Sequence, residues 1–250
     1  MEKWGFSNLS LKSGNYRTRR IGVLVAFLGG VVIWLLVNPA SYENLFVSVE
    51  NTGAESGVNS TDDGTLLAKD VLEKLEVKGR APKTGYKREE FYSGWPDVDG
   101  CSLRQRIIKR ELGDTAVLDG CNVVAGEYDE PYTGEHKVYS KKEEISKIQI
   151  DHVVALSDAW QKGAQYLEKA VRYKIATDPL NLLAVDGTAN KQKSDGDAAT
   201  WLPSNKQFRC QYIARQISVK YKYSLWVTDA EKQAMANVLL NCPKEPSIGI

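Results

Sequence analysis

The stretch Lys147-Ile-Gln-Ile-Asp-His152 ends a short apolar run in an acidic residue and a histidine. Asn181 follows twenty-nine residues after His152, Asn190 nine residues later, and Lys193 three residues beyond that. A histidine supplies acid–base chemistry near neutral pH, and carboxylate and amide oxygens are the ligands that hard divalent cations prefer. Since the chain has only two histidines, His152 is the main candidate for a general base.

Each of these residues also has an ordinary structural explanation. Asp151 and His152 can simply end a strand, with the imidazole bound to a backbone carbonyl, because buried polar groups usually find structural partners. Asn181 can be a turn residue and Asn190 a helix cap. The functional interpretation therefore depends on the order and spacing of the whole set.

The hydrophobic pattern around the set predicts a hairpin packed on a helix. The expected elements are strands at 145–150 and 181–185, with helices at 157–163 and 166–177 between them. Asn190 lies in or next to a helical turn after the second strand. We therefore expect an α+β fold in which hairpin and helix bring Asp151 and Asn190 to the same cation, with His152 beside it.

The rest of the chain predicts further helices and strands. Apolar residues at helical spacing indicate helices, and short β-rich runs bounded by turn residues indicate strands. The expected helices are 65–77, 102–112, 206–221 and 228–240, and the expected strands are 117–128, interrupted at Asp119-Gly120, and 136–140. The last helix opens with a capping-box pattern, Thr228-x-x-Glu231.

An uninterrupted apolar run at 21–37 predicts a membrane-spanning helix. Basic residues before it place residues 1–20 in the cytoplasm and the following chain outside, by the positive-inside rule. Residues 38–64 have the polar, acidic composition of a flexible stalk. An uncleaved anchor is favoured over a cleaved signal peptide, and a buried core helix is the remaining alternative. We expect a single-pass cell-membrane protein with an extracytoplasmic C-terminal domain, or a secreted protein if the segment is cleaved.

The part of the chain beyond the stalk divides into three. Residues 65–85 are expected to form a helix and linker, residues 86–242 the compact domain, and residues 243–250 a tail. Net charge is +1, so a nucleic-acid partner requires a local basic patch and not a basic domain.

Four cysteines accompany the predicted export, and none forms a C-x-x-C pair that would suggest a zinc ribbon. An even number in an exported domain indicates two disulfides. Three pairings are possible, and free buried thiols are the alternative. The local pairing, Cys101–Cys121 with Cys210–Cys242, is the one we expect.

Three segments together carry a resemblance to a known family. They are Ile150-Asp-His-Val-Val-Ala-Leu-Ser-Asp-Ala-Trp160, Asp178-Pro-Leu-Asn-Leu-Leu-Ala-Val185 and Asn190-Lys-Gln-Lys-Ser-Asp195. The chain resembles the HNH endonucleases, also called ββα-metal or His-Me finger nucleases, and most closely the exported bacterial members. The resemblance covers about residues 86–242. It implies a ββα-metal core with a helical insertion and C-terminal helices.

The resemblance also implies a role for each residue of the set. His152 is expected to be the general base that activates water, and Asp151 and Asn190 to hold one Mg²⁺ or Mn²⁺ ion. Asn181 is expected to hold the histidine loop in register, and Lys193 to contact a substrate phosphate. The third family position is Asn190 where many relatives have histidine, which makes zinc a less suitable metal.

The expected function is an extracytoplasmic, metal-dependent endonuclease that hydrolyses DNA with little sequence preference. The low preference is inferred because the sequence contains no separate recognition module, and no obligate protein partner is expected. A non-catalytic surface protein that binds nucleic acid on the same scaffold is the main alternative. A nuclease toxin is a third, disfavoured because the chain has no long delivery region.

Overall fold

The computed structural model describes residues 65–250. The expected cytoplasmic segment, membrane anchor and stalk fall at residues 1–64 and lie outside the described residues. Between residues 65 and 250, none of the helices combines the length and the apolar character needed to cross a bilayer. The described part is a mixed α+β structure with three small antiparallel sheets, which confirms the expected fold class.

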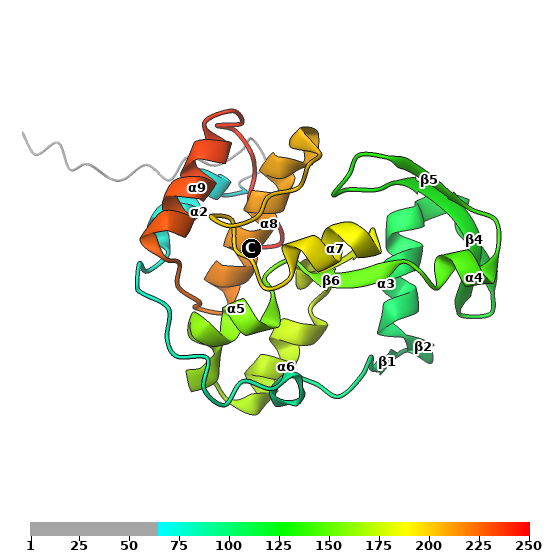
Figure 1. Ribbon diagram of the computed structural model, residues 1–250, viewed down its shortest axis with the longest axis horizontal. Coiled ribbons are helices and arrows are strands. Elements are labelled where there is room, and N and C mark those ends of the chain that lie inside the picture. The colour runs from blue at the N-terminus through cyan, green and yellow to red at the C-terminus, as the bar shows by residue number, and fades with distance from the viewer. Residues whose placement is uncertain (1–64) are drawn as a thin grey trace, which may run out of the picture. The chain divides into compact units, whose positions relative to one another are not determined.

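A two-stranded hairpin followed by a short helix lies at the centre of the fold. Strand β6 (Gln149–His152) pairs with β7 (Leu182–Val185), so that Asp151 lies opposite Leu183. All four residues of β7 are buried. Helix α7 (Gly187–Lys193) follows directly, and the Asp186 carboxylate caps it by accepting hydrogen bonds from the backbone N–H groups at the helix start. Figure 1 shows α7 lying along β6.

The chain between the two strands forms the expected helical insertion. It consists of α5 (Leu156–Gln161) and α6 (Lys169–Thr177). These helices share a hydrophobic core with an upstream aromatic segment that includes Phe91 and Tyr92. The segment between α2 and α3 is largely irregular and runs beneath this insertion in Figure 1.

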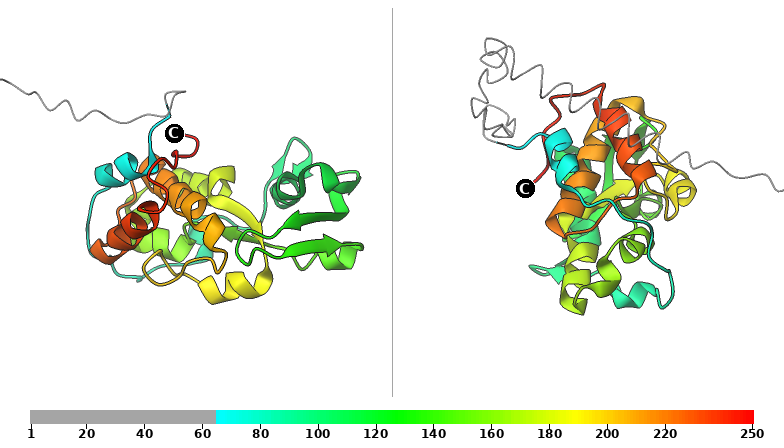
Figure 2. Two further views of the ribbon diagram at one scale, coloured as in Figure 1. Left: turned by 90° about the horizontal axis from the view of Figure 1, so that it is seen from above. Right: turned by 90° about the vertical axis from the view of Figure 1, so that its left-hand side faces the viewer.

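Three helices pack together on the other side of the hairpin. They are α2 (Ala68–Lys74), α8 (Arg209–Lys222) and α9 (Asp229–Leu239). The capping box at the start of α9 is present as predicted, with Thr228 and Glu231 exchanging hydrogen bonds. Figure 2 shows the three helices gathered around the C-terminal part of the chain.

The folded unit begins before residue 86, which corrects the expected domain boundary. Val71 and Leu72 of α2 are buried in the same core as Tyr212 and Met235. The C-terminal tail also joins this unit, because the Ser247 N–H donates to the Leu66 carbonyl at 2.8 Å. The expected helix of residues 65–85 is thus present as α2, and its apolar face is buried in this core.

A three-stranded sheet extends from the opposite end of the hairpin, as the left view of Figure 2 shows. It contains β3 (Val117–Asp119), β4 (Asn122–Asp129) and β5 (His136–Tyr139), in that order. Helix α3 (Leu103–Leu112) packs on this sheet and on β7. Two short strands, β1 (Asp97–Val98) and β2 (Cys101–Ser102), precede α3. The 3-10 turns are η2 (Arg88–Glu90), η3 (Gly113–Thr115), η4 (Ala164–Tyr166), η5 (Pro179–Asn181) and η6 (Lys206–Phe208).

The expected strand at 145–150 is partly wrong. Residues Lys142–Ile145 form a short helix, α4, and the strand begins only at Gln149. The helical turn allows Ile145 and Ile148 to enter the same core beneath α3, which a continuous strand with alternating faces would not do.

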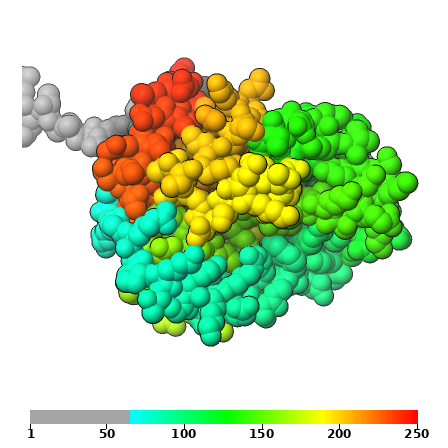
Figure 3. All heavy atoms as spheres, in the orientation of Figure 1, coloured from blue at the N-terminus to red at the C-terminus, as the bar shows by residue number. Residues whose placement is uncertain are grey.

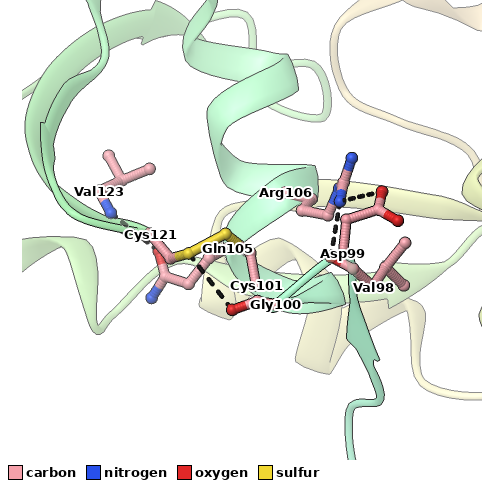
Figure 4. Close-up of a disulfide and its surroundings, with 8 residues drawn as sticks. All are labelled: Val98, Asp99, Gly100, Cys101, Gln105, Arg106, Cys121 and Val123. Atoms are coloured by element: carbon pink, nitrogen blue, oxygen red, sulfur yellow. Dashed lines mark hydrogen bonds and ion pairs between the residues drawn. A yellow bond between two sulfur atoms is a disulfide. The ribbon is translucent and has the colours of Figure 1, made fainter.

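Both local disulfides are present, as expected. Cys101 is bonded to Cys121, joining β2 to the turn between β3 and β4, and Cys210 is bonded to Cys242, joining α8 to the segment after α9. Figure 4 shows the first bridge beside Arg106, which binds Asp99 and the Val98 carbonyl.

Candidate active site

Asp151 lies on the face of β6 that contacts α7. The Lys193 ammonium is 3.0 Å from each carboxylate oxygen of Asp151 and also donates to the His152 carbonyl at 2.9 Å. The Tyr132 hydroxyl donates to the same carboxylate at 2.5 Å. Burial raises the pKa of Asp151, and the contacts with Lys193 and Tyr132 oppose that shift. The carboxylate, which is 6% exposed, is thus held in one orientation by two donors.

Asn190 lies one helical turn before Lys193 and faces the same strand. Its side-chain nitrogen donates to the Gln149 side-chain oxygen at 2.8 Å, which leaves its own amide oxygen as an acceptor. Strand and helix are therefore joined by two successive pairs, Gln149 with Asn190 and Asp151 with Lys193. The structure brings Asp151 and Asn190 to one interface, but it pairs each with a different partner.

The oxygen atoms of Asp151 and Asn190 at this interface are suitable ligands for a hard divalent cation. A carboxylate and an amide oxygen are ligands of the kind that Mg²⁺ and Mn²⁺ accept. A carboxylate has about four lone-pair positions, so Asp151 can hold Tyr132 and Lys193 and still offer an oxygen to a metal. The Lys193 ammonium competes with a metal for the Asp151 carboxylate. A bound metal ion would share this carboxylate with Lys193.

His152 ends β6, and its imidazole contacts the helical insertion and the aromatic segment that includes Tyr92 and Trp95. The structure therefore shows no contact of the imidazole with Asn190 or with the Asp151 carboxylate, although His152 was expected beside the cation that these two residues hold. The Nε2 of His152 lies 2.9 Å from the Ala176 carbonyl oxygen. The Trp95 ring stacks on the imidazole at 6.0 Å with an interplanar angle of 10°, and the Tyr92 ring is 5.7 Å away. Only 4% of His152 is exposed.

The contacts of His152 determine its tautomer and its charge. A carbonyl oxygen can only accept, so Nε2 carries the proton and Nδ1 keeps its lone pair. Burial is the main cause that lowers the pKa of His152 to about 3, and the positive charges of Arg88 and Lys193 act in the same direction against the Ala176 hydrogen bond. The imidazole is therefore neutral near pH 7 and keeps a lone pair on Nδ1, although burial makes this nitrogen a weaker base than that of a histidine in water.

Asn181 fastens the loop that follows His152. Its side chain accepts from the Val154 N–H at 2.8 Å and donates to the Ile175 carbonyl at 3.0 Å. It is fully buried. Ile175 immediately precedes Ala176, the residue that binds the imidazole, so one asparagine positions both the histidine loop and the partner of the histidine.

Several residues of this site have no signal in the sequence. Tyr132 lies nineteen residues before Asp151, and no role at the Asp151 carboxylate was expected for it from the sequence. Tyr92 and Trp95 come from the irregular segment between α2 and α3, and Gln149 looks like an ordinary strand residue. Only packing brings these side chains to Asp151, His152 and Asn190, because none of them has a characteristic spacing from the set.

A cluster of buried charges supports the loop after α7. Lys162 is fully buried and lies 2.7 Å from carboxylate oxygens of Asp158, Asp197 and Glu231. Lys220 approaches Asp158 and Glu231 at 3.2 and 2.9 Å. The cluster joins α5, α8 and α9 to the loop that continues from Lys193. Its five buried members are Asp158, Lys162, Asp197, Lys220 and Glu231, and the exposed Arg80 binds Asp158 and Asp197 at the edge of the cluster.

The pKa values of the two histidines are expected to be shifted in opposite directions from the ordinary value of 6.5. The hydrogen bond with Asp129 raises the pKa of the exposed His136, whereas burial keeps His152 neutral down to about pH 3. In an NMR titration of the metal-free protein between pH 5 and 8, the imidazole signals of His136 should move and those of His152 should not. Two imidazoles titrating together near pH 6.5 would contradict the buried placement of His152.

The same shift has a consequence for stability. An unfolded His152 takes up a proton near pH 6.5, and the folded one does so only near pH 3. Between these values the unfolded state binds more protons. The stability contributed by this group is therefore complete above pH 6.5 and decreases as the pH falls toward 3.

Comparisons with known proteins give two matches. Residues 105–238, more than half of the chain, match the family described as GmrSD restriction endonucleases, C-terminal domain. A relative from Arthroderma benhamiae, described as an uncharacterized secreted protein, is 33% identical over 178 residues, which cover 70% of this chain and 84% of the relative. No solved structure matches the chain.

Proposed function

The chain belongs to the family of GmrSD restriction endonuclease C-terminal domains, and from that premise we propose that it is an HNH-type, metal-dependent endonuclease that hydrolyses phosphodiester bonds of DNA. In this proposal β6, β7 and α7 are the ββα-metal core. The observation that carries it is the imidazole of His152, neutral and held by the Ala176 carbonyl, directly after the buried Asp151. Asp151 and Asn190 each bind a residue across the interface of the same strand with α7, Asp151 binding Lys193 and Asn190 binding Gln149.

His152 acts as the general base. With Nε2 donating to Ala176, Nδ1 is the nitrogen that accepts a proton from the attacking water. The protonated imidazole keeps its hydrogen bond to the carbonyl, which stabilises the charged form. Asn181 holds the geometry, since it binds both the loop after His152 and the carbonyl beside Ala176.

Asp151 and Asn190 would hold the divalent metal. The ion, when bound, supplies positive charge at the phosphate and at the leaving oxygen. Lys193 orients the Asp151 carboxylate and balances its charge. A direct phosphate contact by Lys193, as the resemblance implies, requires its ammonium to leave Asp151.

We place the enzyme outside the cytoplasm. Two disulfides are consistent with an oxidising compartment, and the relative from Arthroderma benhamiae is described as secreted. A single-pass anchor at 21–37 remains part of the proposal. A phosphatase fusion after residue 64 that is active outside the cytoplasm would support the topology.

Cleavage of nucleic acid by residues 65–250 is the direct test. We expect nicking and degradation of plasmid DNA in Mg²⁺ or Mn²⁺, and complete loss of cleavage when a chelator is added. Single-stranded DNA and RNA assayed in parallel define the substrate class. If the parent protein binds nucleic acid but cuts none of the three with either metal, the non-catalytic binding protein becomes the better explanation.

A further inference from the structure

The irregular segment between α2 and α3 supplies one side of the candidate active site. Its residues Tyr92 and Trp95 lie against the imidazole of His152, although they precede it by about sixty residues in the sequence. The segment (cyan to blue-green) runs across the surface below α7 in Figures 1 and 3. The part of the segment that includes Tyr92 and Trp95 is therefore next to the proposed base.

Arg88, a charged residue of this segment, contacts the ring and the hydroxyl group of Tyr92. Its guanidinium carbon lies 5.1 Å from the centre of the Tyr92 ring, and its Nη2 donates to the Tyr92 hydroxyl. Tyr92 is buried and its ring is 5.7 Å from the imidazole of His152. A single aromatic side chain thus contacts both the arginine and the proposed base.

The charge of Arg88 has no carboxylate partner among residues 65–250, and its side chain is exposed. Three other arginines bind carboxylates: Arg80 binds Asp158 and Asp197, Arg106 binds Asp99, and Arg172 binds Glu90. Arg104, Arg209 and Arg215 bind backbone carbonyls instead; of the arginines in residues 65–250 without a carboxylate partner, Arg88 is the one whose ring partner also contacts His152. An exposed guanidinium without a carboxylate partner, held against the ring that contacts His152, is suited to bind an anion at the surface over that residue.

We propose that Arg88 binds a phosphate of the nucleic-acid substrate next to His152, and that Tyr92 is the positioning residue for its guanidinium. The planar guanidinium offers parallel donors to two phosphate oxygens. The inference rests on the proposed nuclease function, and it adds a substrate-binding residue that lies outside the set of spaced residues around the hairpin. A competing explanation is that Arg88 only covers the Tyr92 ring.

Binding measured without cleavage tests the proposal. In residues 65–250 carrying His152→Ala, with chelator present, the affinity for a fluorescent DNA duplex is measured by anisotropy over a salt series. Arg88→Ala is expected to weaken binding on the order of tenfold at low salt and to reduce the slope of log affinity against log salt by about 0.9, the value for one phosphate contact on duplex DNA. Arg88→Lys should keep most of the slope, because it keeps the charge, while losing affinity.

Two further variants separate binding from structure. Arg106→Ala is the matched control, since it removes an exposed arginine whose charge Asp99 already compensates, and its affinity and salt slope should stay unchanged. Tyr92→Phe removes the hydroxyl that orients Arg88 and should weaken binding less than Arg88→Ala. If the Arg88→Ala protein is unfolded by circular dichroism, Arg88→Lys and Tyr92→Phe decide the question.

The outcomes distinguish this proposal from the nuclease proposal. Equal effects of Arg88→Ala and Arg106→Ala on affinity and slope would overturn the role of Arg88, whether or not the parent cuts DNA. A parent that never cuts, combined with a specific loss of binding in Arg88→Ala, would overturn the nuclease proposal and keep the phosphate site.

Discussion

Replacing His152 with alanine is expected to lower the rate of DNA cleavage by a factor on the order of 10² to 10⁴, the range that a positioned general base contributes. The only other histidine, His136, lies on β5, is exposed and binds Asp129 of β4. His136→Ala is therefore the matched control and should cut at the parental rate. Single-turnover cleavage of plasmid DNA in saturating Mg²⁺ measures both. If His152→Ala cuts as well as the parent, the assignment of the base is wrong.

The two asparagines should respond differently from His152 in the same assay. Asn190→Ala removes a proposed ligand and should shift the metal dependence to higher Mg²⁺ concentration. Asn181→Ala removes buried hydrogen bonds to Val154 and Ile175. It should lower turnover without changing the metal requirement, because it alters the position of the histidine loop and not the donors. A shift in metal dependence for Asn181→Ala would contradict its purely positional role.

The second large effect concerns stability and not chemistry. Lys162→Met is expected to lower the free energy of unfolding by about 3–5 kcal/mol, the usual cost of removing one partner from a buried ionic cluster. Lys162 is fully buried and contacts three carboxylates at 2.7 Å, and methionine fills the space without the charge. For a protein of this size the melting temperature should fall by roughly 6–20 °C.

The exposed pair of Lys232 with Glu73 provides the control for this measurement. The ions are 2.9 Å apart, but Glu73 is largely in solvent, so Lys232→Met should change stability by less than about 1 kcal/mol. Chemical denaturation of both variants gives their free energies of unfolding, which compares the buried cluster with the exposed ion pair. If Lys162→Met unfolds at the same denaturant concentration as the parent, the cluster does not stabilise the fold in the way its burial indicates.

Much of the local structure could be predicted because it is encoded within short segments. The capping box of α9 needs only Thr228 and Glu231, and the hairpin of β6 and β7 follows from two apolar runs around one insertion. The local disulfide pairing was also correct, since each bridge joins segments that pack together. The strand was predicted to start at Ile145 but starts at Gln149, because residues 142–145 form a helical turn that buries Ile145 in the core beneath α3.

The sequence by itself determined the set Asp151, His152, Asn181, Asn190 and Lys193, because these residues lie within one hairpin and one helix and keep a characteristic spacing. Only the tertiary structure decided which of them touch. Lys193 sits on the Asp151 carboxylate and Asn190 binds Gln149, while distant aromatic residues enclose the base. The physical reason is that such contacts join segments far apart in the chain, and their partners are selected by shared burial in a packed core. No spacing within one segment records that selection.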